Sequence, residues 1–525
     1  MRNRFLAIQI VFFLFIHAAA LGQWQWAIQG KSGDGKGKSV SVDSVGNIYA
    51  TISYNDSLHL WNNSYVKKGL LLAKFTNTGQ LIGGSPFNFP FFGSSTYAIS
   101  MEMQKGNIYF TGSDDTSLFL STYDTALHVT KKFKNFIYAT KVFPDDSNGV
   151  YVYGGANYDG PCIDTFCVRR PGFNWSEHVI AHVNGNGKVK WMKNSNGANN
   201  AYGAMQYANN TLYCFMANDS AFTFDTLQSQ LVPFLPSAFP VQTIFCALQS
   251  NGSLKWSMPI NDANINFLID SKSSMYFAGN IDSSIAFSDD SLRHISGTAT
   301  NFYLVKLDSN RHVAWSRILS STNIVSGGPM VMAANGEIFM YAAFLGQFTV
   351  DGFTITSTQT KPGAVDHFVA RFDTNGVCKG LVALPFADYR DFAVDAQGAV
   401  YFTGSLNPGD NHFGSYNLHV DVNQGSDFFL AKLAQVNGIR ETPKQTIGEL
   451  RIFASPNHGT FTIQLPNGDA ISEEASIKLV DEGGAVVRVV KQAVNPIHLG
   501  EISRGTYMVE VRQAGNTYVG RVVIQ

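Results

Sequence analysis

The sequence predicts an all-β protein, a seven-bladed β-propeller followed by a small immunoglobulin-like β-sandwich. Three observations support this fold class. A strand–turn–strand pattern recurs seven times between residues 42 and 401. Only 15% of the residues are charged, while Gly (48), Phe (40) and Tyr (21) are abundant, as expected where aromatic residues build strands and Gly builds turns. A different pattern of short alternating strands begins near residue 449.

The repeat is clearest from the aromatic residue that follows each Asp/Asn–Gly type turn. These aromatic residues are Tyr49, Tyr109, Tyr151, Tyr213, Tyr276, Phe339 and Tyr401. The steps between them are 60 to 63 residues, except for one step of 42. A near-constant period in a β-patterned chain indicates stacked or radial sheets, because one such unit cannot bury its own apolar face.

A second line of sequence follows each aromatic strand and consists of an apolar run, a Gly turn and often a Trp. The runs that end in Trp are residues 180–183 before Trp191, 245–248 before Trp256 and 304–307 before Trp315. Two strand–turn–strand pairs in each unit make four strands, which is one propeller blade. A linear β-solenoid is the alternative, but its coils are much shorter than this period.

The order of the units predicts how the ring closes. The seventh unit ends at Leu433 without a Trp strand, whereas Trp24 and Trp26 stand at the beginning without a preceding unit. We therefore expect the N-terminal strand to complete the last blade and to remove the free sheet edges. Alternatively, these two Trp side chains pack beneath the first blade.

The N-terminal residues have the pattern of a secretory signal. Arg2 and Arg4 precede an apolar run at residues 5–16, and small residues follow up to Gly22, where cleavage is expected. No later segment is long and apolar enough to cross a bilayer. We therefore expect a soluble, exported mature protein without a transmembrane segment.

The domain organisation follows from these patterns. Residues 1–22 are predicted to be the signal peptide, 23–434 the propeller and 435–448 a polar linker. The short strands expected in residues 449–525 suggest a small β-sandwich.

The C-terminal segment contains a recognisable set of residues in a fixed order: Pro456, Asn457, Gly459, Asp481, Gly484, Gly505, Tyr507 and Arg521. This order resembles the C-terminal (type A) sorting domain of the type IX secretion system. His458 stands where a second Pro often follows the Asn, and the last basic residue is Arg rather than Lys. The resemblance implies a Bacteroidetes-type bacterium, the type IX machinery as a partner, and passage through the periplasm and outer membrane to the cell surface or beyond. A sandwich used for adhesion is the alternative.

The repeated body resembles bacterial β-propeller repeat proteins, with lines such as residues 106–112 and 401–404. This group shares a fold and no common activity, so the resemblance implies no function.

Charge and turn chemistry argue against several kinds of ligand. The formal net charge is −1 and no run of Lys or Arg occurs, so nucleic acid is not expected as a partner. The Asp residues of the repeat serve their hairpin turns, and Asp43, Asp270 and Asp395 lack the spaced carboxylates of a calcium loop. Residues 30–39 are rich in Gly but lack the first Gly and the helix of a phosphate loop. No cofactor is predicted.

Few residues are candidates for catalysis. Residues 23–434 contain only three Glu, at positions 102, 177 and 337, whereas propeller hydrolases need paired carboxylates or a Tyr–Glu pair in the central mouth. Glu337 occupies a hairpin turn and is expected to be solvated, and the doublet Asp145–Asp146 is expected to lie in a loop. No Gly-x-Ser-x-Gly elbow or zinc-type His spacing occurs.

We therefore predict a non-catalytic surface or extracellular binding or adhesion module for an unknown glycan or protein. Its contact surface is expected in the loops at residues 157–177 and 228–242. The alternative is a secreted propeller hydrolase or lyase that acts on polysaccharide.

The five Cys residues divide into two groups. Cys162 and Cys167 lie close together in an insertion, and exported proteins permit disulfides, so they form a candidate disulfide; two separate thiols are the alternative. Cys214, Cys246 and Cys378 are expected to be ordinary core thiols.

Overall fold

The computed structural model describes residues 24–66, 68–87, 100–113, 118–134, 138–156, 162–163, 166–167, 177–196, 202–218, 221–232, 241–258, 260, 265–281, 284–287, 290–293, 301–359, 364–421, 425–437, 446–466, 468–472, 475–481, 486–491, 494–500, 502–513 and 516–525. The chain divides into two compact units, Met1–Arg440 and Glu441–Gln525. The regular structure of the described residues consists of strands, which confirms the all-β prediction. Among these residues, no helix long and apolar enough to span a membrane is found. The predicted signal peptide lies outside the described residues.

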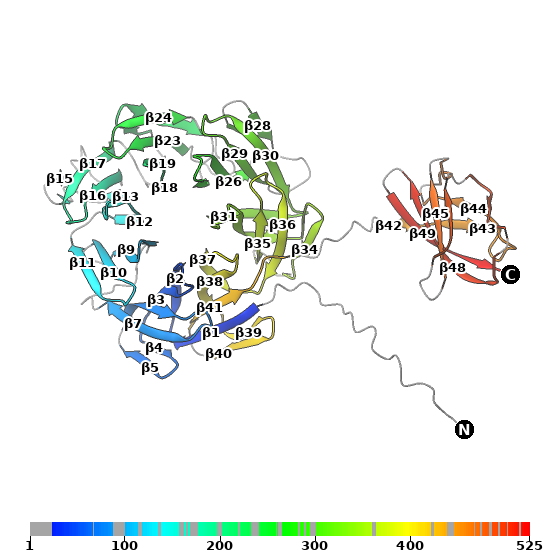
Figure 1. The fold of residues 1–525 in the computed structure, drawn as a ribbon, viewed down its shortest axis with the longest axis horizontal. Helices are drawn as coiled ribbons and strands as arrows, with labels where there is room; N and C mark the ends of the chain where they lie inside the picture. The colour runs from blue at the N-terminus through cyan, green and yellow to red at the C-terminus, as the bar shows by residue number, and fades with distance from the viewer. Residues whose placement is uncertain are drawn as a thin grey trace, which may run out of the picture. The chain divides into compact units, whose positions relative to one another are not determined.

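The first unit is a propeller-like ring of antiparallel sheets (Figure 1). Its sheets are numbered here in chain order. Sheet 1 contains β2 (Lys36–Val42), β3 (Ile48–Tyr54), β6 (Gly69–Phe75) and β7 (Leu81–Phe87). Sheet 2 contains β8 (Ser100–Gln104), β9 (Asn107–Ser113), β10 (Leu118–Asp124) and β11 (Val129–Lys134). Sheet 3 contains β12 (Tyr138–Pro144), β13 (Val150–Ala156), β16 (Glu177–Val183) and β17 (Val189–Asn196).

The remaining sheets repeat this order. Sheet 4 contains β18 (Tyr202–Ala208), β19 (Thr211–Asn218), β23 (Val241–Gln249) and β24 (Leu254–Met258), and β22 (Gln230–Val232) also pairs with β23. Sheet 5 contains β25 (Asn266–Ile269), β26 (Met275–Ile281), β29 (Asn301–Leu307) and β30 (Val313–Ser320). Sheet 6 contains β31 (Ile324–Met332), β32 (Ile338–Leu345), β35 (Asp366–Phe372) and β36 (Cys378–Leu384). Sheet 7 contains β37 (Asp388–Val394), β38 (Val400–Leu406), β41 (Asp427–Leu433) and β1 (Trp24–Ser32).

Short hairpins are inserted between the second and third strands of most sheets. They are β4 (Ser57–Leu60) with β5 (Asn63–Val66), β14 (Cys162–Ile163) with β15 (Phe166–Cys167), β20 (Thr223–Phe224) with β21 (Leu227–Gln228), β27 (Ser284–Phe287) with β28 (Asp290–Arg293), β33 (Gln347–Val350) with β34 (Phe353–Thr356), and β39 (Gly409–Phe413) with β40 (Tyr416–Val420). The hairpins β4–β5 and β20–β21 extend the outer edge of the preceding sheet, by pairing with β1 and β17. Outer edges covered in this way are protected from pairing with other chains.

The sheets are held together by apolar cores between neighbours. Figure 1 shows first strands such as β12, β18 and β31 nearest the centre of the ring and fourth strands such as β24 and β30 further out. One buried cluster joins Phe245 of sheet 4 to Phe277 of sheet 5, and another joins Phe302 of sheet 5 to Phe368 of sheet 6. Because each core needs two sheets, a single unit is not stable by itself, as the repeat predicts.

The N-terminal strand closes the ring. β1 pairs antiparallel with β41 of sheet 7, with Trp24 opposite Leu433 and Gly30 opposite Phe428. Its far end pairs with the hairpin β4–β5 that follows the second strand of sheet 1, with Ser32 opposite Leu58. Trp24 is buried against the core of sheets 6 and 7. The prediction of closure by the N-terminal strand is therefore confirmed.

The repeated turns use Asp and Gly as predicted. The Asp43 Oδ1 atom accepts the backbone N–H groups of Val45 at 3.1 Å and Asn47 at 2.8 Å. Gly46 in the same turn has φ +89°, a conformation that suits glycine. These carboxylate oxygens are therefore occupied by the turn that they cap.

The second unit consists of two sheets. The larger contains β42 (Thr446–Glu449), β49 (Asn516–Ile524), β48 (Gly505–Gln513), β45 (Ser476–Val480) and β46 (Val486–Lys491). The smaller contains β43 (Arg451–Phe453), β44 (Thr460–Gln464) and β47 (Ile497–His498). One core includes Phe461 from the smaller sheet and Ile477 and Val509 from the larger. β42 lies at the end of the stretch predicted to be a linker and pairs with β49, so these residues belong to the second unit.

Candidate functional site

One position in the third strand of each sheet recurs opposite the repeat aromatic. In sheets 1, 5 and 7 this position is Lys, and the register pairs Tyr49 with Lys74, Tyr276 with Lys306 and Tyr401 with Lys432. The ammonium groups lie 5.4, 5.0 and 5.1 Å from the Tyr ring centroids, within cation–π range. The Tyr hydroxyls donate to the turn residues Asp43, Asp270 and Asp395 at 3.2, 3.3 and 2.9 Å. We call this arrangement the Asp–Tyr–Lys set.

Two of these Lys side chains cross to the next sheet. Lys74 Nζ donates to the carbonyl oxygen of Thr125 in sheet 2 at 2.7 Å. Lys306 Nζ donates to the carbonyl oxygen of Thr374 in sheet 6 at 3.3 Å. The Asp–Tyr–Lys set therefore fills the space between neighbouring sheets and ties their turns together.

A tryptophan in the outer strand makes a second link between sheets. Trp315 Nε1 donates to the Thr374 carbonyl at 3.0 Å. A Cβ atom added at Gly376 in the same turn would lie 2.8 Å from the Trp315 ring, and Gly376 has φ +76°. The same pairing joins Trp26 to Gly79 and Trp191 to Gly252. We call this contact the tryptophan latch, and it explains the Gly–Trp spacing of the sequence repeat.

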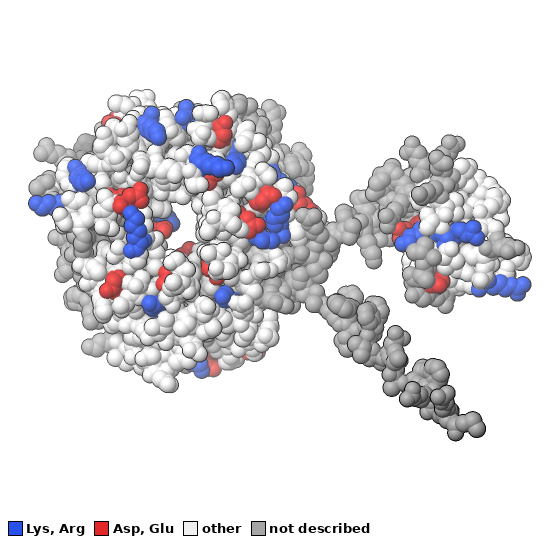
Figure 2. Space-filling view, viewed as in Figure 1, with Lys and Arg blue, Asp and Glu red and all other residues white. Residues whose placement is uncertain are grey.

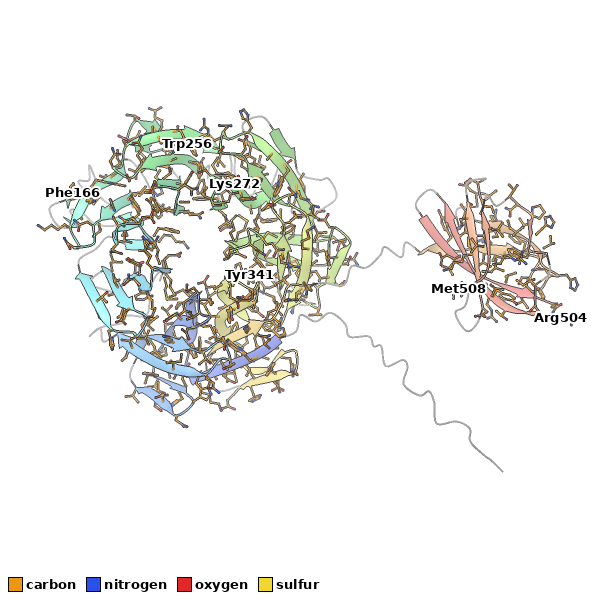
Figure 3. All side chains as sticks on the ribbon, viewed as in Figure 1. Phe166, Trp256, Lys272, Tyr341, Arg504 and Met508 are labelled. Carbon is orange, nitrogen blue, oxygen red and sulfur yellow. The ribbon has the colours of Figure 1, made fainter. Side chains whose placement is uncertain are left out.

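The junction between sheets 4 and 5 uses a variant of the latch. Arg311, with φ +73°, stands where the other turns have Gly. Its guanidinium lies 5.0 Å from the ring centroid of Trp256. Trp256 lies on the outer part of sheet 4, away from the central opening (Figure 3).

Sheet 3 departs from the Asp–Tyr–Lys set. His182 stands opposite Tyr151, and the two rings stack with centroids 4.4 Å apart. His182 Nε2 lies 2.7 Å from Asp145 Oδ2, and both side chains are almost fully buried. Asp145 Oδ1 accepts the backbone N–H groups of Ser147 at 2.7 Å and Gly149 at 2.6 Å. Asp145 lies in the turn between β12 and β13, as predicted, but its carboxylate is also a buried partner of His182, which the sequence did not indicate.

Burial and hydrogen bonding fix the protonation of this pair. Burial lowers the pKa of His182 below its ordinary value, and the hydrogen bond and charge of Asp145 oppose this effect. Burial tends to raise the pKa of Asp145, but hydrogen bonds from His182, Ser147 and Gly149 outweigh it, and the pKa is lowered. At neutral pH Asp145 is therefore ionised and His182 is neutral. The Nε2–H group of His182 donates a hydrogen bond to the Asp145 carboxylate.

A pocket of about 530 Å³ lies between sheets 3 and 4, beside this pair. Its volume is within the usual range for small-molecule sites. The residues that line it are Asp145, Asp146, Ser147, Tyr151, His182, Lys190, Trp191, Tyr207, Asn210, Ser250 and Asn251. We call it the 3–4 pocket.

Aromatic rings and neutral polar groups dominate the 3–4 pocket. Tyr151 and Tyr207 have ring centroids 4.7 Å apart, and Tyr207 donates its hydroxyl hydrogen to Asn210 Oδ1 at 3.0 Å. Trp191 is half-buried, and its Nε1 donates to the Ser250 carbonyl at 2.9 Å. The oxygens of Asp145 already accept four hydrogen bonds, from His182, the Ser147 hydroxyl and two backbone groups. This carboxylate is therefore occupied structurally, and the rings and amides remain for a ligand.

A second group of charged residues lies on the innermost strands. Figure 2 shows a central opening with acidic and basic side chains gathered around its mouth. Burial raises the pKa of Glu102 on β8 to about 7, with Lys141 opposing and Asp391 reinforcing the shift. Burial also raises the pKa of Asp391 on β37 to about 6, against a hydrogen bond of 2.9 Å from the Val40 N–H. Both carboxyl groups thus change charge near neutral pH.

Several sequence predictions are decided by these contacts. Glu337, expected to be solvated, is partly buried and forms an ion pair of 3.4 Å with Arg371, so its carboxylate is only partly exposed to solvent. Cys214, Cys246 and Cys378 are buried free thiols, as predicted. The loops at 157–177 and 228–242 lie largely outside the described residues.

No sequence motif indicated Asp391 or His182 as candidate site residues. The one available signal for His182 is its position opposite Tyr151, which is found only when the repeats are aligned and the strand register is known.

The predicted disulfide pair lies in the ribbon β14–β15, where Cys162 stands directly opposite Cys167. Opposed Cα atoms of antiparallel strands are about 4.5–5.5 Å apart, within the range that a disulfide spans. The disulfide remains a prediction that this backbone register permits.

Among the motif residues of the second unit, Asn457 ties the turn after β43 to the last strand, β49. The Asn457 side chain donates to the Ala454 carbonyl at 2.6 Å and accepts the Gly459 N–H at 2.7 Å. The Asn457 N–H donates to the carbonyl of Val523, near the chain end, at 3.0 Å. Tyr507 is buried and donates to the Ser503 carbonyl at 2.6 Å.

The other motif residues lie in different structural positions of the second unit. Arg521 is exposed on β49 opposite Met508. Pro456 precedes Asn457 in the turn after β43, and Gly505 begins β48. Asp481 directly follows β45, whereas Gly484 lies outside the described residues.

Comparison with known families decides the nature of this second unit. Residues 451–525 match the family described as the secretion system C-terminal sorting domain. The chain carries a C-terminal sorting domain. A type IX domain of this kind implies interaction with the secretion machinery and export to the cell surface or the extracellular space.

The rest of the chain is similar to solved structures at low identity. They include a DUF4221 family member from Bacteroides vulgatus (10% identity, TM-score 0.35, covering 66% of this chain and 95% of that chain). The Dos1 propeller also matches, with 10% identity, a TM-score of 0.37 and coverage of 78% of this chain and 95% of that chain. An oligogalacturonate lyase in complex with manganese matches with 10% identity, a TM-score of 0.35 and coverage of 77% of this chain and 98% of that chain. No curated protein matches the sequence. Matches at this level say nothing of ligand or activity.

Proposed function

We propose that this chain is an exported, non-catalytic binding module that takes its ligand in the 3–4 pocket. In this proposal sheets 1 to 7 are the blades of a seven-bladed β-propeller over residues 23–434, after a signal peptide at 1–22. The predicted linker, shortened at its end by β42, connects it to an immunoglobulin-like sandwich that serves delivery. The main support is that an aromatic-lined pocket lies where His182 replaces the bridging Lys of the repeat.

The ligand suited to this pocket is a glycan. Half-buried Trp191 and Tyr207 offer ring faces for the apolar faces of a sugar, and Asn210 and Asn251 offer donors and acceptors for hydroxyl groups. Small-molecule sites typically contain a small number of polar groups placed among aromatic rings. No cofactor and no nucleic acid enter the proposal.

A glycan array followed by calorimetry tests this function on residues 23–525. His182→Lys introduces the Lys found in sheets 1, 5 and 7, where the side chain lies between two sheets. We expect this variant to keep the thermal stability of the wild type and to bind any array hit at least about tenfold more weakly, a loss of about 1.4 kcal/mol. Val66→Lys, on an exposed strand of the outer hairpin β4–β5, is the charge-matched control. Undiminished binding by His182→Lys would overturn the proposal.

Delivery by the sorting domain is tested separately in the native host. Truncation after Arg440, which keeps the buried Val436, is expected to leave a folded propeller in the periplasm, because separate cores fold independently. Fusion of residues 449–525 to a passive reporter is expected to carry that reporter outside the cell. If the truncated chain still reaches the surface in normal amounts, the sorting role is wrong.

The Cys162–Cys167 disulfide is part of the proposal for the exported protein. Because the closed loop is short, we expect it to contribute about 2–3 kcal/mol at most. Peptide mass mapping of the exported protein should find the linked peptide. Alkylation of both thiols without reductant would exclude it.

Catalysis on polysaccharide is the second candidate function. It is favoured by Glu102 and Asp391, whose raised pKa values let each hold or release a proton near neutral pH, as a general acid must. If the chain degrades polygalacturonate or xylan, Glu102→Gln should abolish turnover and leave binding intact. Absence of turnover by the wild type on every array hit supports the binding module instead.

A further inference from the structure

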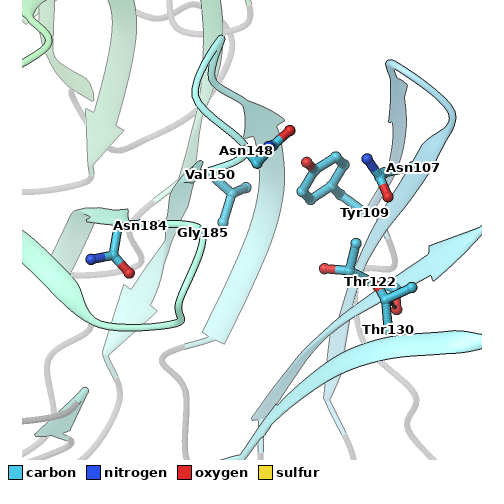
Figure 4. Close-up of a pocket in the computed structure, with 8 residues that line it drawn as sticks. All are labelled: Asn107, Tyr109, Thr122, Thr130, Asn148, Val150, Asn184 and Gly185. Atoms are coloured by element: carbon cyan, nitrogen blue, oxygen red, sulfur yellow. Dashed lines mark hydrogen bonds between the residues drawn. The ribbon is translucent and has the colours of Figure 1, made fainter.

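A second cavity lies on the other side of the turn that borders the 3–4 pocket. It has a volume of about 190 Å³, and Figure 4 shows its lining: Asn107, Tyr109, Thr122, Thr130, Asn148, Val150, Asn184 and Gly185. We call it the 2–3 cavity, because it lies between sheets 2 and 3. Residues 145–149 contribute Asn148 to this cavity and Asp145, Asp146 and Ser147 to the 3–4 pocket. The two spaces are therefore neighbours across one five-residue turn.

The 2–3 cavity exists for the same reason as the 3–4 pocket. In sheet 2, the position opposite Tyr109 is Thr122 instead of Lys. Lys74 and Lys306 donate to the second residue of the turn in the next sheet, Thr125 and Thr374. The corresponding residue in sheet 3 is Gly185, which follows the turn residue Asn184 and lines the cavity. A Thr side chain is too short to reach it, so the space stays open.

Three of the polar side chains in the 2–3 cavity are available to a ligand, whereas the Thr130 hydroxyl donates to the Thr122 carbonyl and Asn184 Oδ1 accepts two backbone N–H groups of its own turn. Tyr109 is only 4% exposed, and within the described residues its hydroxyl has no hydrogen-bond partner, unlike Tyr49 and Tyr276. The amide groups of Asn107 and Asn148 likewise make no side-chain hydrogen bond to a described residue. A hydroxyl and two amides without a protein partner can each exchange a hydrogen bond with water for one with a ligand hydroxyl.

The chemistry of the lining favours neutral hydroxyl groups. Every polar side chain that lines the 2–3 cavity is an amide or a hydroxyl, and none is charged. Figure 4 shows the Tyr109 ring between Asn107 and Asn148, so a donor–acceptor amide lies on each side of it.

We propose that the 2–3 cavity and the 3–4 pocket are adjacent subsites for one neutral oligosaccharide, which crosses the turn at residues 145–149. This inference rests on the proposed function and names its ligand class. Five residues span at most about 18 Å when fully extended, so a ligand of a few sugar units reaches both spaces. The aromatic 3–4 pocket provides stacking, and the amides of the 2–3 cavity provide hydrogen bonds to hydroxyl groups.

Thr122→Lys is the decisive variant, because it places in sheet 2 the residue that sheets 1, 5 and 7 carry. We expect its ammonium group to reach the Gly185 carbonyl and to fill the 2–3 cavity without loss of thermal stability. The probes are neutral cello-, xylo- and manno-oligosaccharides from mono- to hexasaccharide, with oligogalacturonates as acidic probes. Asn148→Ala is a second variant that removes an amide without filling space, and Val66→Lys is again the charge-matched control.

The expected result is a dependence on chain length. Wild-type affinity for the neutral series should rise with length and then level off, and Thr122→Lys should lower the affinity for the longer members about tenfold, which corresponds to the loss of two or three hydrogen bonds. The shortest members should bind both proteins equally. His182→Lys should weaken binding at every length.

Other outcomes overturn the inference and are distinguishable. If Thr122→Lys and Asn148→Ala bind every length as the wild type does, while His182→Lys does not, the 3–4 pocket is a single site and only the two-subsite inference fails. Tighter binding of oligogalacturonates than of neutral chains also overturns it. If His182→Lys binds as well as the wild type, or no probe binds, the proposed function fails together with it.

Discussion

The junction between sheets 5 and 6 and the junction between sheets 3 and 4 are built from the same parts, yet one is bridged and the other contains a pocket. Both have a buried Tyr in the second strand, Tyr276 and Tyr151, and both have a tryptophan latch. They differ at the position opposite the Tyr. Lys306 crosses to Thr374 of sheet 6, whereas His182 is held at 2.7 Å from Asp145 within its own sheet.

This difference shows that framework and site are separable in a repeat of this kind. The latch and the apolar cores hold neighbouring sheets together wherever they occur, so the side chain opposite the Tyr is free to vary. At the junction of sheets 5 and 6 the long Lys306 side chain reaches the next sheet, and at the junction of sheets 3 and 4 the shorter His182 borders a pocket. A binding site can therefore arise at one junction without any change in the sheets.

The largest effect is expected at the junction between sheets 7 and 1, where the latch residue Trp26 lies on a strand from the other end of the chain. Deletion of β1 removes this latch, the pairing with β41 and the buried Trp24. We expect a loss of many kcal/mol, or of cooperative folding altogether, because a free edge and an open core remain. Thermal melting with size-exclusion chromatography measures this. An unchanged melt with a monomeric protein would show that the closure contributes nothing.

The next effect separates stability from binding at the two compared junctions. Trp315→Ala and Trp191→Ala each remove a half-buried ring and a hydrogen bond to the next sheet. We expect each to lower the free energy of unfolding by about 2–4 kcal/mol. Only Trp191→Ala should also weaken glycan binding, measured by calorimetry below the melting transition. Equal loss of binding in both variants would contradict a site at the 3–4 pocket.

A smaller effect tests the glycine of the latch. Gly376→Ala forces a Cβ atom to 2.8 Å from Trp315 at φ +76°, and we expect a loss of about 2 kcal/mol in urea unfolding. Arg311→Gly makes the opposite change at the junction of sheets 4 and 5. It relieves a positive φ but removes a cation–π contact, and because each is worth about 1 kcal/mol the net change should be small. A large loss in Arg311→Gly would mean that the guanidinium holds that junction by other contacts.

The smallest effect is a difference in pH dependence between the wild type and His182→Lys. In the unfolded chain a histidine takes up a proton near its ordinary pKa of 6.5, whereas burial keeps His182 neutral to lower pH in the folded protein. At pH values between the folded-state and unfolded-state pKa of His182, the unfolded state binds more protons than the folded state. The stability of the wild type therefore falls as the pH falls below 6.5. Lys carries its proton in both states over this range and lacks the effect.

We therefore expect His182→Lys to gain stability relative to the wild type on acidification, by at most about 1.4 kcal/mol per pH unit. Urea unfolding between about pH 5 and 7.5 measures this difference. His178, whose pKa burial lowers to about 3, contributes equally to both proteins and cancels. A stability difference that does not change with pH would mean that His182 is protonated in the folded state.

The sequence predicted the parts of the fold that depend on local physical chemistry. Turn residues such as Asp43 and Gly46 were identified because their backbone chemistry is local. The missing Trp strand after Leu433 led to the closure by β1, which the structure confirms. The site was not found, because Asp145 and His182 are 37 residues apart and have no motif.

The sequence by itself determined the repeat, its closure and the sorting domain, because strand alternation, turn chemistry and a motif order are properties of neighbouring residues. Only the tertiary structure decided which junctions are filled. That outcome depends on whether the side chain opposite each Tyr is long enough to reach the turn of the next sheet, as Lys74 and Lys306 are and as Thr122 and His182 are not. The distance to be crossed lies between residues of different sheets, and it exists only when the ring is assembled.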